Sequence, residues 1–158
     1  MARIIIVIFS LLYLSCKKEK SPAPLDSNNQ LNATVILLSG ETVKINAVGS
    51  KAKMGCGILG GGTFLWGTDE MDRAVILNVY SNSSCVNGPG TYAFRCEYRT
   101  NVSSQNAPIY SNSFAADHGS ITFTTPGGNY AEGHFYAICR YLNDSVVVQG
   151  TFKGYIPY

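Results

Sequence analysis

The five cysteines of this 158-residue chain are the residues with the most readily interpreted chemistry. No two of them have the Cys-x-x-Cys spacing of zinc ribbons and thioredoxin-type sites, so neither metal binding nor thiol–disulfide exchange is expected. Four fall in the later part of the chain and form an even set: Cys56, Cys85, Cys96 and Cys139. Such a set predicts disulfide bonds in an oxidising compartment, with three connectivities open. The alternative is that some stay free as small buried apolar residues.

The fifth cysteine, Cys16, ends a segment with the layout of an export signal. Arg3 gives a short positive start, residues 4–14 are almost entirely apolar, and the small Ser15 precedes the cysteine. As a helix, this run covers about 16 Å at ~1.5 Å per residue, roughly half of a ~30 Å hydrocarbon core. A membrane span is therefore excluded, and we predict a signal peptide at residues 1–15.

The residues around Cys16 point to a lipid anchor. Tyr13-Leu14-Ser15-Cys16 resembles the lipobox of bacterial lipoproteins, and Cys16-Lys17-Lys18-Glu19 resembles the mature start of Bacteroidota-type lipoproteins. The resemblance implies that the Cys16 thiol carries a diacylglycerol and its amine a further acyl chain, which together hold a membrane firmly. It favours the outer membrane and leaves open whether the domain is periplasmic or surface-exposed. Ordinary signal cleavage, with Cys16 as a plain thiol, is the alternative.

Charge and composition divide the rest of the chain into a tether and one domain. Residues 16–32 are rich in Lys, Ser, Pro and Asn and have little apolar surface to bury, which is typical of a tether. Residues 33–158 are long enough for a single domain with its own core. This domain has eight basic and eight acidic side chains and no basic stripe, so nucleic-acid binding is not expected.

The dominant pattern in residues 33–158 is period-two alternation interrupted by Gly, Asn and Ser. We expect an all-β fold, a single antiparallel β-sandwich or barrel-like domain. The expected strands are 33–38, 42–48, 63–67, 73–80, 91–98, 120–125, 134–142 and 145–155. Hairpins are expected at 39–41, 68–72 and 143–144.

Alternation also places two of the cysteines. Cys96 shares a face with Tyr92, Phe94 and Tyr98, and Cys139 lies on a similarly aromatic face of its strand. If both faces point inward, a Cys96–Cys139 bridge would join two strands or sheets. Cys56 and Cys85, in looser Gly- and Asn-rich segments, would then pair with each other.

Three short motifs carry a second resemblance, over roughly residues 63–158. They are Gly88-Pro89-Gly90-Thr91-Tyr92, Gly119-Ser120-Ile121-Thr122-Phe123 and Gly150-Thr151-Phe152. They are similar to the recurrent pattern of small all-β Bacteroidota lipoproteins of unknown function. The resemblance implies a fold and a location, without an activity.

Several other patterns could suggest chemistry, but each lacks what that chemistry requires. Residues 55–60 fit Gly-x-Gly-x-x-Gly, yet the glycines that follow cannot begin the helix a dinucleotide site needs, so no cofactor is expected. His118 and His134 lack metal-ligand spacing, and the acidic turn at 69–72 lacks EF-hand spacing. No Gly-x-Ser-x-Gly string occurs, and a hydrolase would need an active site assembled from distant residues.

Aromatic residues are the remaining candidates for ligand contact. Tyr110, Phe114 and Tyr130 fall in expected loops, where rings can stack on sugars or anchor a protein interface. The sequence therefore predicts a non-catalytic binding or structural module of the cell envelope, attached to the membrane through Cys16. A glycan or an envelope protein is the expected partner, and a glycan-binding accessory lipoprotein is the leading alternative.

Overall fold

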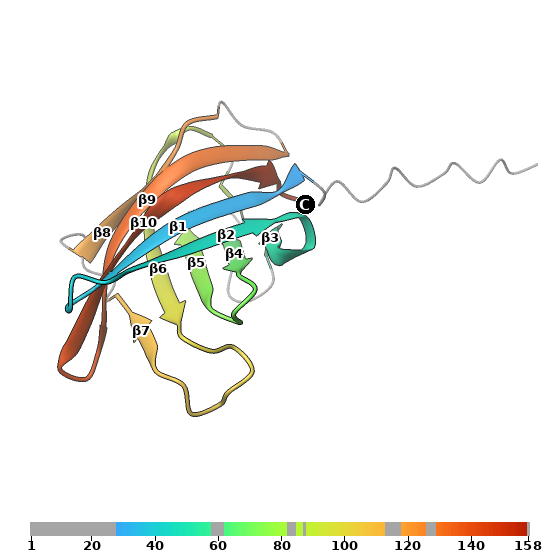
Figure 1. The fold of residues 1–158 in the computed structure, drawn as a ribbon. Coiled ribbons are helices and arrows are strands. Elements are labelled where there is room, and N and C mark those ends of the chain that lie inside the picture. Colours follow the sequence, from blue (N-terminus) through green and yellow to red (C-terminus); the bar gives the residue numbers. More distant parts are fainter. Residues whose placement is uncertain are drawn as a thin grey trace, which may run out of the picture.

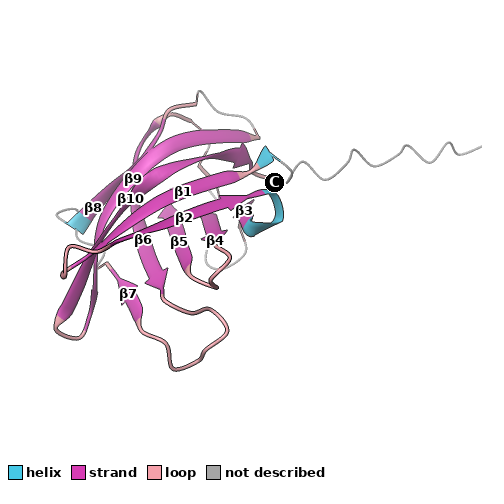
Figure 2. Cartoon of the chain, in the orientation of Figure 1, coloured by secondary structure: helices cyan, strands magenta, loops and turns pink. Residues whose placement is uncertain are grey.

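The computed structural model describes residues 28–57, 62–81, 85–86, 88–112, 118–125 and 129–157. Within these ranges the regular structure is nearly all β-strand, with short 3-10 segments that include a turn after β2 (Figure 2). The strands are β1 (Gln30–Leu37), β2 (Thr42–Val48), β3 (Ala52–Cys56), β4 (Thr63–Thr68), β5 (Ala74–Tyr80), β6 (Gly90–Arg99), β7 (Ile109–Ser111), β8 (Gly119–Phe123), β9 (Tyr130–Tyr141) and β10 (Asp144–Tyr155).

All ten strands belong to one antiparallel sheet that curls into a small barrel (Figure 1). The order is β2-β1-β10-β9-β7-β6-β5-β4-β3, and β8 also lies between β9 and β6. Apart from β2 and β3, and β7 and β8, strands that follow one another in the sequence pair with each other. The first strand, β1, also pairs with the last, β10. This up-and-down arrangement removes most of the exposed sheet edges that would otherwise invite aggregation.

A corner in the chain, between the β1–β2 and β3–β4 hairpins, joins the two ends of the sheet. β2 pairs with β1, the 3-10 turn η2 (Gly49–Lys51) bends the chain, and β3 then pairs with β4. Gly49 begins the turn with φ of 61°, a conformation that costs glycine little. Its N–H donates to the carbonyl oxygen of Asn29 at 2.8 Å, which ties the corner to the start of β1.

A second interruption lies between β6 and β9, where β7 and β8 act as two pieces of one strand. β7 pairs with the end of β6, and β8 pairs with its beginning. Between them, the buried side chain of Asn112 takes the place of strand backbone: the Cys96 N–H donates to its Oδ1 at 2.7 Å. The Asn112 N–H in turn donates to the Cys96 carbonyl oxygen at 3.1 Å. Counting β2–β3 and β7–β8 as one strand each, the ten strands make an eight-stranded barrel.

Inward-facing side chains from all parts of the sheet fill the barrel. The largest fully buried ones are Tyr98, Phe152, Leu31, Ile45, Leu65, Leu77 and Ile121. The wall at the corner packs closely because β4 has a glycine there. A Cβ on Gly67 would lie 2.8 Å from the Leu31 side chain and 3.1 Å from Ala47. The alternating burial of β2 and β9 is the direct result of this one-sided packing.

The structure confirms the all-β antiparallel fold and the three expected hairpins. Of the two architectures left open, a barrel rather than a sandwich forms, since one sheet closes on itself. The domain starts earlier than residue 33: β1 begins at Gln30, and both Asn29 and Leu31 are fully buried. Two strands were not predicted, β3 and β7, because glycine interrupts the first and the second is only three residues long.

Close packing of the barrel wall leaves no room for a side chain at Gly150, in the middle of β10. A Cβ there would overlap the carbonyl oxygen of Asn32 and lie 2.9 Å from the Phe135 ring. Gly150→Ala should lower the free energy of unfolding by about 1–3 kcal/mol, the usual cost of overpacking. Gly88→Ala is the matched control, because nothing lies within 4 Å of a Cβ at Gly88. Equal urea midpoints for the two variants would contradict the close packing.

Candidate functional site

The residues expected to contact a ligand or the membrane fall into three groups. Tyr130 begins β9 and is 45% exposed, whereas Tyr110 lies in β7 and is only 9% exposed. Phe114 and Cys16 lie outside the described residues. Among the residues that the structure covers, none forms a helix with the length and apolar character needed to cross a membrane.

Tyr110 is a structural residue, contrary to its expected place in a loop. Its hydroxyl donates to Asp144 Oδ2 at 2.8 Å, and its ring packs 5.9 Å from that of Tyr98. Burial, reinforced by the Asp144 carboxylate, raises the pKa of Tyr110 to about 12. Sequence reasoning missed this role because Ile109-Tyr110-Ser111 is too short to show alternation.

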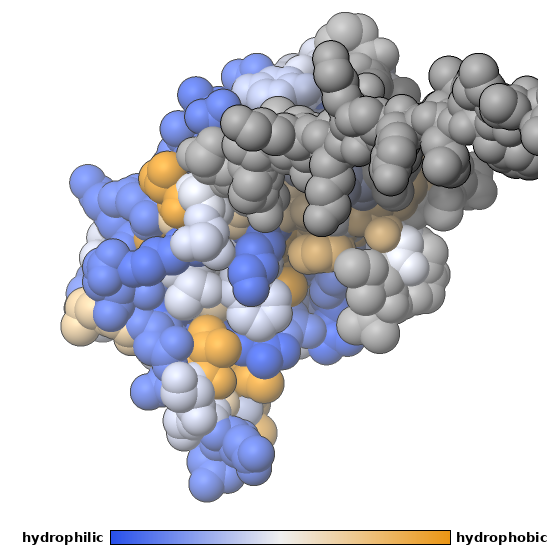
Figure 3. All heavy atoms as spheres, turned by 90° about the vertical axis from the view of Figure 1, so that its right-hand side faces the viewer, coloured by the Kyte–Doolittle hydropathy of each residue, from blue (hydrophilic) through white to orange (hydrophobic). Residues whose placement is uncertain are grey.

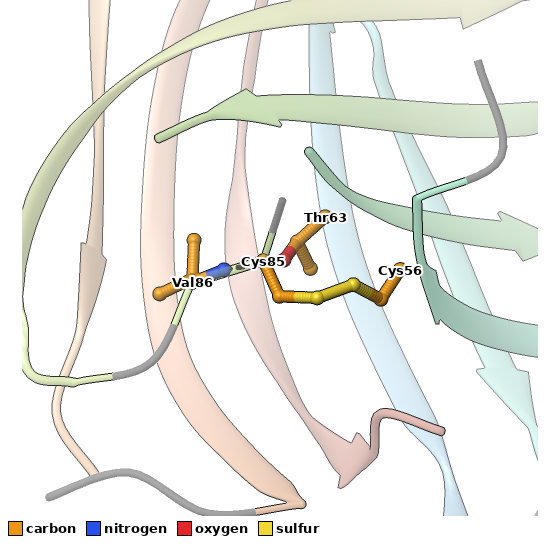
Figure 4. The surroundings of a disulfide bond; sticks show 4 residues. All are labelled: Cys56, Thr63, Cys85 and Val86. Carbon is orange, nitrogen blue, oxygen red and sulfur yellow. Dashed lines mark hydrogen bonds between the residues drawn. A yellow bond between two sulfur atoms is a disulfide. The ribbon is translucent and has the colours of Figure 1, made fainter. Parts of the chain in front are cut away.

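One disulfide forms, between Cys56 at the end of β3 and Cys85 in the β5–β6 connection (Figure 4). The two Cα atoms are 5.5 Å apart, within the normal range for a bridge. Beside it, the Val86 N–H donates to Thr63 Oγ1 at 2.9 Å, so the connection is attached both to the end of β3 and to the start of β4. This is the pairing expected for the two cysteines in Gly- and Asn-rich segments.

The expected Cys96–Cys139 bridge is not formed. Both residues point into the barrel, as alternation predicted, but they are free thiols with no exposed surface. The Cys139 thiol instead donates to the Cys96 carbonyl oxygen at 3.6 Å, next to the Asn112 side chain that fills the wall. Burial and the contact with Cys139 raise the pKa of the Cys96 thiol, which keeps it in the unreactive protonated form.

A groove lies over the outer faces of β4, β5 and β6. We call it the Trp66 groove. Its volume is ≈ 530 Å³. Its lining combines aromatic rings with charged and amide side chains: Phe64, Trp66, Ile76, Asn78, Tyr80, Arg95, Glu97 and Arg99. Gly62 and Thr63 line its end near the disulfide, so the Cys56–Cys85 bridge fixes that end of the groove.

A cation–π contact organises the floor of this groove. The Arg99 guanidinium lies 6.0 Å from the centre of the Trp66 ring, although β5 separates their strands. Since neighbouring strands are ~4.8 Å apart, the Arg99 side chain must cross β5 to reach the indole. This explains why Ala74 and Ile76, which point outward from β5, are 0% and 6% exposed. Trp66 Nε1 donates to Thr68 Oγ1 at 2.6 Å, which orients the ring.

Glu97 holds the two arginines of the Trp66 groove in place. It is 9% exposed and lies between them on the outer face of β6. Its carboxylate is 3.3 Å from Arg95 Nε and 2.9 Å from an Arg99 terminal nitrogen. A carboxylate buried between two guanidinium groups is fully compensated, and the groove as a whole keeps an excess of positive charge.

His134 and the acidic turn at 69–72 lie outside the Trp66 groove. His134 lies with Glu132 and Lys153 in a polar groove over β1, β10, β9 and β8, whose volume is ≈ 400 Å³. In the acidic turn, Asp69 accepts from the N–H groups of Met71 and Arg73. In the described part of the chain, no three His, Cys, Asp or Glu side chains converge to hold a metal ion.

Sequence reasoning did not connect Arg95 and Glu97 with Trp66. Part of the signal was present, because the turn of the second expected hairpin sets the pairing of Trp66 with Ile76. The pairing of Ile76 with Glu97 belongs to β5 and β6, which this turn does not join. The Arg99 contact could not be found this way, since it depends on a side chain that crosses a strand.

The buried thiols of Cys96 and Cys139 make a prediction about reactivity. In the Cys16→Ala chain, neither thiol should react with a thiol-specific reagent while the protein is folded, and both should react in denaturant. The physical reason is that both are fully buried and the Cys96 pKa is raised. Mass mapping should find Cys56 linked to Cys85 only. A peptide linking Cys96 to Cys139 in freshly purified protein would contradict the structure.

Comparison of the chain with family models, with curated proteins and with solved structures gave no match. The function of the protein is therefore inferred from the geometry of the Trp66 groove and from the chemistry of the side chains that line it.

Proposed function

We propose that this chain is a cell-envelope lipoprotein, anchored through Cys16, whose barrel is a non-catalytic binding module. The Trp66 groove is its ligand site. The observation that carries the proposal is that aromatic and hydrogen-bonding side chains line one groove whose floor is rigid. Trp66 is oriented by Thr68, and Glu97 fixes both arginines, so little side-chain entropy remains to be lost on binding.

Two features support a location in the cell envelope. The Cys56–Cys85 disulfide closes a long stretch of chain, and such bonds persist in oxidising compartments. The apolar run and the lipobox-like residues that precede Cys16 supply an export route and an attachment point. The termini of the described chain also meet at one end of the barrel, where Tyr155 N–H donates to Asn29 Oδ1 at 2.8 Å. The start of β1 and the C-terminal end lie side by side in Figure 1, so the tether from Cys16 would join the barrel at this end.

A glycan is the ligand that the groove fits best. Trp66, Phe64 and Tyr80 supply ring faces for stacking on a sugar, and the Tyr80 side chain is 39% exposed. Asn78, Arg95 and Glu97 line the same groove and supply hydrogen-bond donors and acceptors for sugar hydroxyls. Among the coloured atoms of Figure 3, apolar groups lie in small clusters between hydrophilic ones.

The lipid anchor predicts where the protein is found after cell fractionation. The full chain should sediment with membranes, and Cys16→Ala should move to the soluble fraction, because the acyl chains provide the attachment. Metabolic labelling with a fatty-acid analogue should mark the first protein and not the second. Sedimentation of Cys16→Ala with membranes would overturn the anchoring.

The groove predicts which substitution removes ligand binding. On a glycan array, the barrel should bind a subset of glycans saturably. Trp66→Ala should weaken this binding about fivefold to a hundredfold, the effect of losing about 1–3 kcal/mol, as for the loss of one ring that stacks on a nucleic-acid base. Tyr136→Ala is the matched control, because Tyr136 is an aromatic residue of β9 that is 40% exposed and lies outside the Trp66 groove. Equal losses in both variants, or no saturable binding by the parent protein, would count against the groove.

A further inference from the structure

We propose that the Trp66 groove selects glycans that carry carboxylate groups, such as polymers of uronic acids. This inference rests on the proposed glycan-binding function and adds the charge of the ligand. Its basis is the arrangement of cationic side chains around the indole.

Positive charge surrounds Trp66 on two sides. Lys53 is the cross-strand neighbour of Trp66 on β3 and is exposed, while Arg95 and Arg99 lie across β5 on β6. Glu97 is the one carboxylate that lines the groove. Two arginines against one glutamate leave the groove with a charge of +1 (2 − 1), and Lys53 at its margin adds another. A domain with balanced charges overall therefore has an excess of positive charge at the Trp66 groove.

The arginines have donors available for a second carboxylate. Arg95 contacts Glu97 through Nε, which leaves its terminal nitrogens at a side chain that is 42% exposed. Two parallel N–H groups on one guanidinium match the two oxygens of a carboxylate. Glu97 already holds the guanidinium in place, so an incoming carboxylate meets donors that are oriented in advance.

Arg99 is a second cation whose donors are only partly satisfied. Glu97 binds one of its terminal nitrogens, and its Nε, which is shielded from solvent, has no hydrogen-bond partner among the described residues. The side chain is 32% exposed, and its guanidinium lies over the Trp66 ring. A sugar packed at the indole would therefore bring its substituents to the exposed part of this guanidinium.

A neutral sugar would satisfy these donors only with hydroxyl groups, which are weaker acceptors than carboxylates. A uronic-acid residue combines both requirements on one ring: an apolar face for the indole and a carboxylate for the guanidinium groups. The selectivity is therefore expected to come from charge-assisted hydrogen bonds, and the base affinity from stacking.

The test compares two ligands that differ only in charge. Oligogalacturonate and its methyl ester share one backbone, and the ester lacks the negative charges. Calorimetry at low salt should show the acid form binding about tenfold tighter than the ester, with the difference shrinking as ionic strength rises. The protein used is the folded mature chain with Cys16→Ala.

The matched variants are Arg95→Gln and Lys44→Gln. Arg95→Gln removes one cation of the groove, and Lys44→Gln removes one exposed cation of β2 outside it. Arg95→Gln should lose most of the tenfold preference, and a urea midpoint close to that of the parent shows that it is folded. Lys44→Gln should behave like the parent.

The outcomes separate this inference from the function on which it rests. Equal affinity for both ligands, or an unchanged preference in Arg95→Gln, overturns the selectivity for carboxylates and leaves glycan binding in place. Saturable binding of the ester alone also overturns it. Absence of binding to either ligand and to the neutral glycans of the array overturns both the selectivity and the proposed function.

Discussion

Closure of one sheet upon itself is the constraint on which the rest of this structure depends. The barrel is small, and its interior is filled by side chains, so the walls must approach one another closely where the chain turns its corner at η2. Gly67 of β4 provides this approach, because Leu31 and Ala47 occupy the space that a Cβ would need. The same inward packing decides the alternation of every long strand, since each apolar residue that points inward leaves its neighbour on the outside.

Because side chains fill the interior of the barrel, the ligand site among the described residues lies on its outer surface. Over β4–β6, the Arg99 side chain lies across β5, reaches Trp66 and covers Ala74 and Ile76. Two apolar residues are thereby buried on the side of the sheet that faces water. The stacking ring and the guanidinium groups are consequently held by packing as well as by the ion pairs with Glu97.

The elements that sequence reasoning predicted correctly are those whose alternation is long enough to read. β2 and β5 are nearly as expected, and Cys96 and Cys139 do face inward, because period-two burial is set by local sequence. The errors come from information that is not local. Tyr110 looks like a loop residue until β6 and β9 flank it, and the two inner thiols are close without being bonded. To predict the Trp66 groove, one would need the register of β4, β5 and β6 and the position of the long Arg99 side chain.

The break between β7 and β8 concentrates the continuity of the wall in one side chain. Ser111 pairs with Arg140 and Gly119 pairs with Ala137, so Ile138 and Cys139 of β9 lie between the last pair of β7 and the first pair of β8. At this point the amide of Asn112 contacts the backbone of Cys96 and of Phe94 on β6. A carboxylate of the same shape lacks the N–H donor toward Phe94, so this position distinguishes asparagine from aspartate even though the two side chains fill the same space.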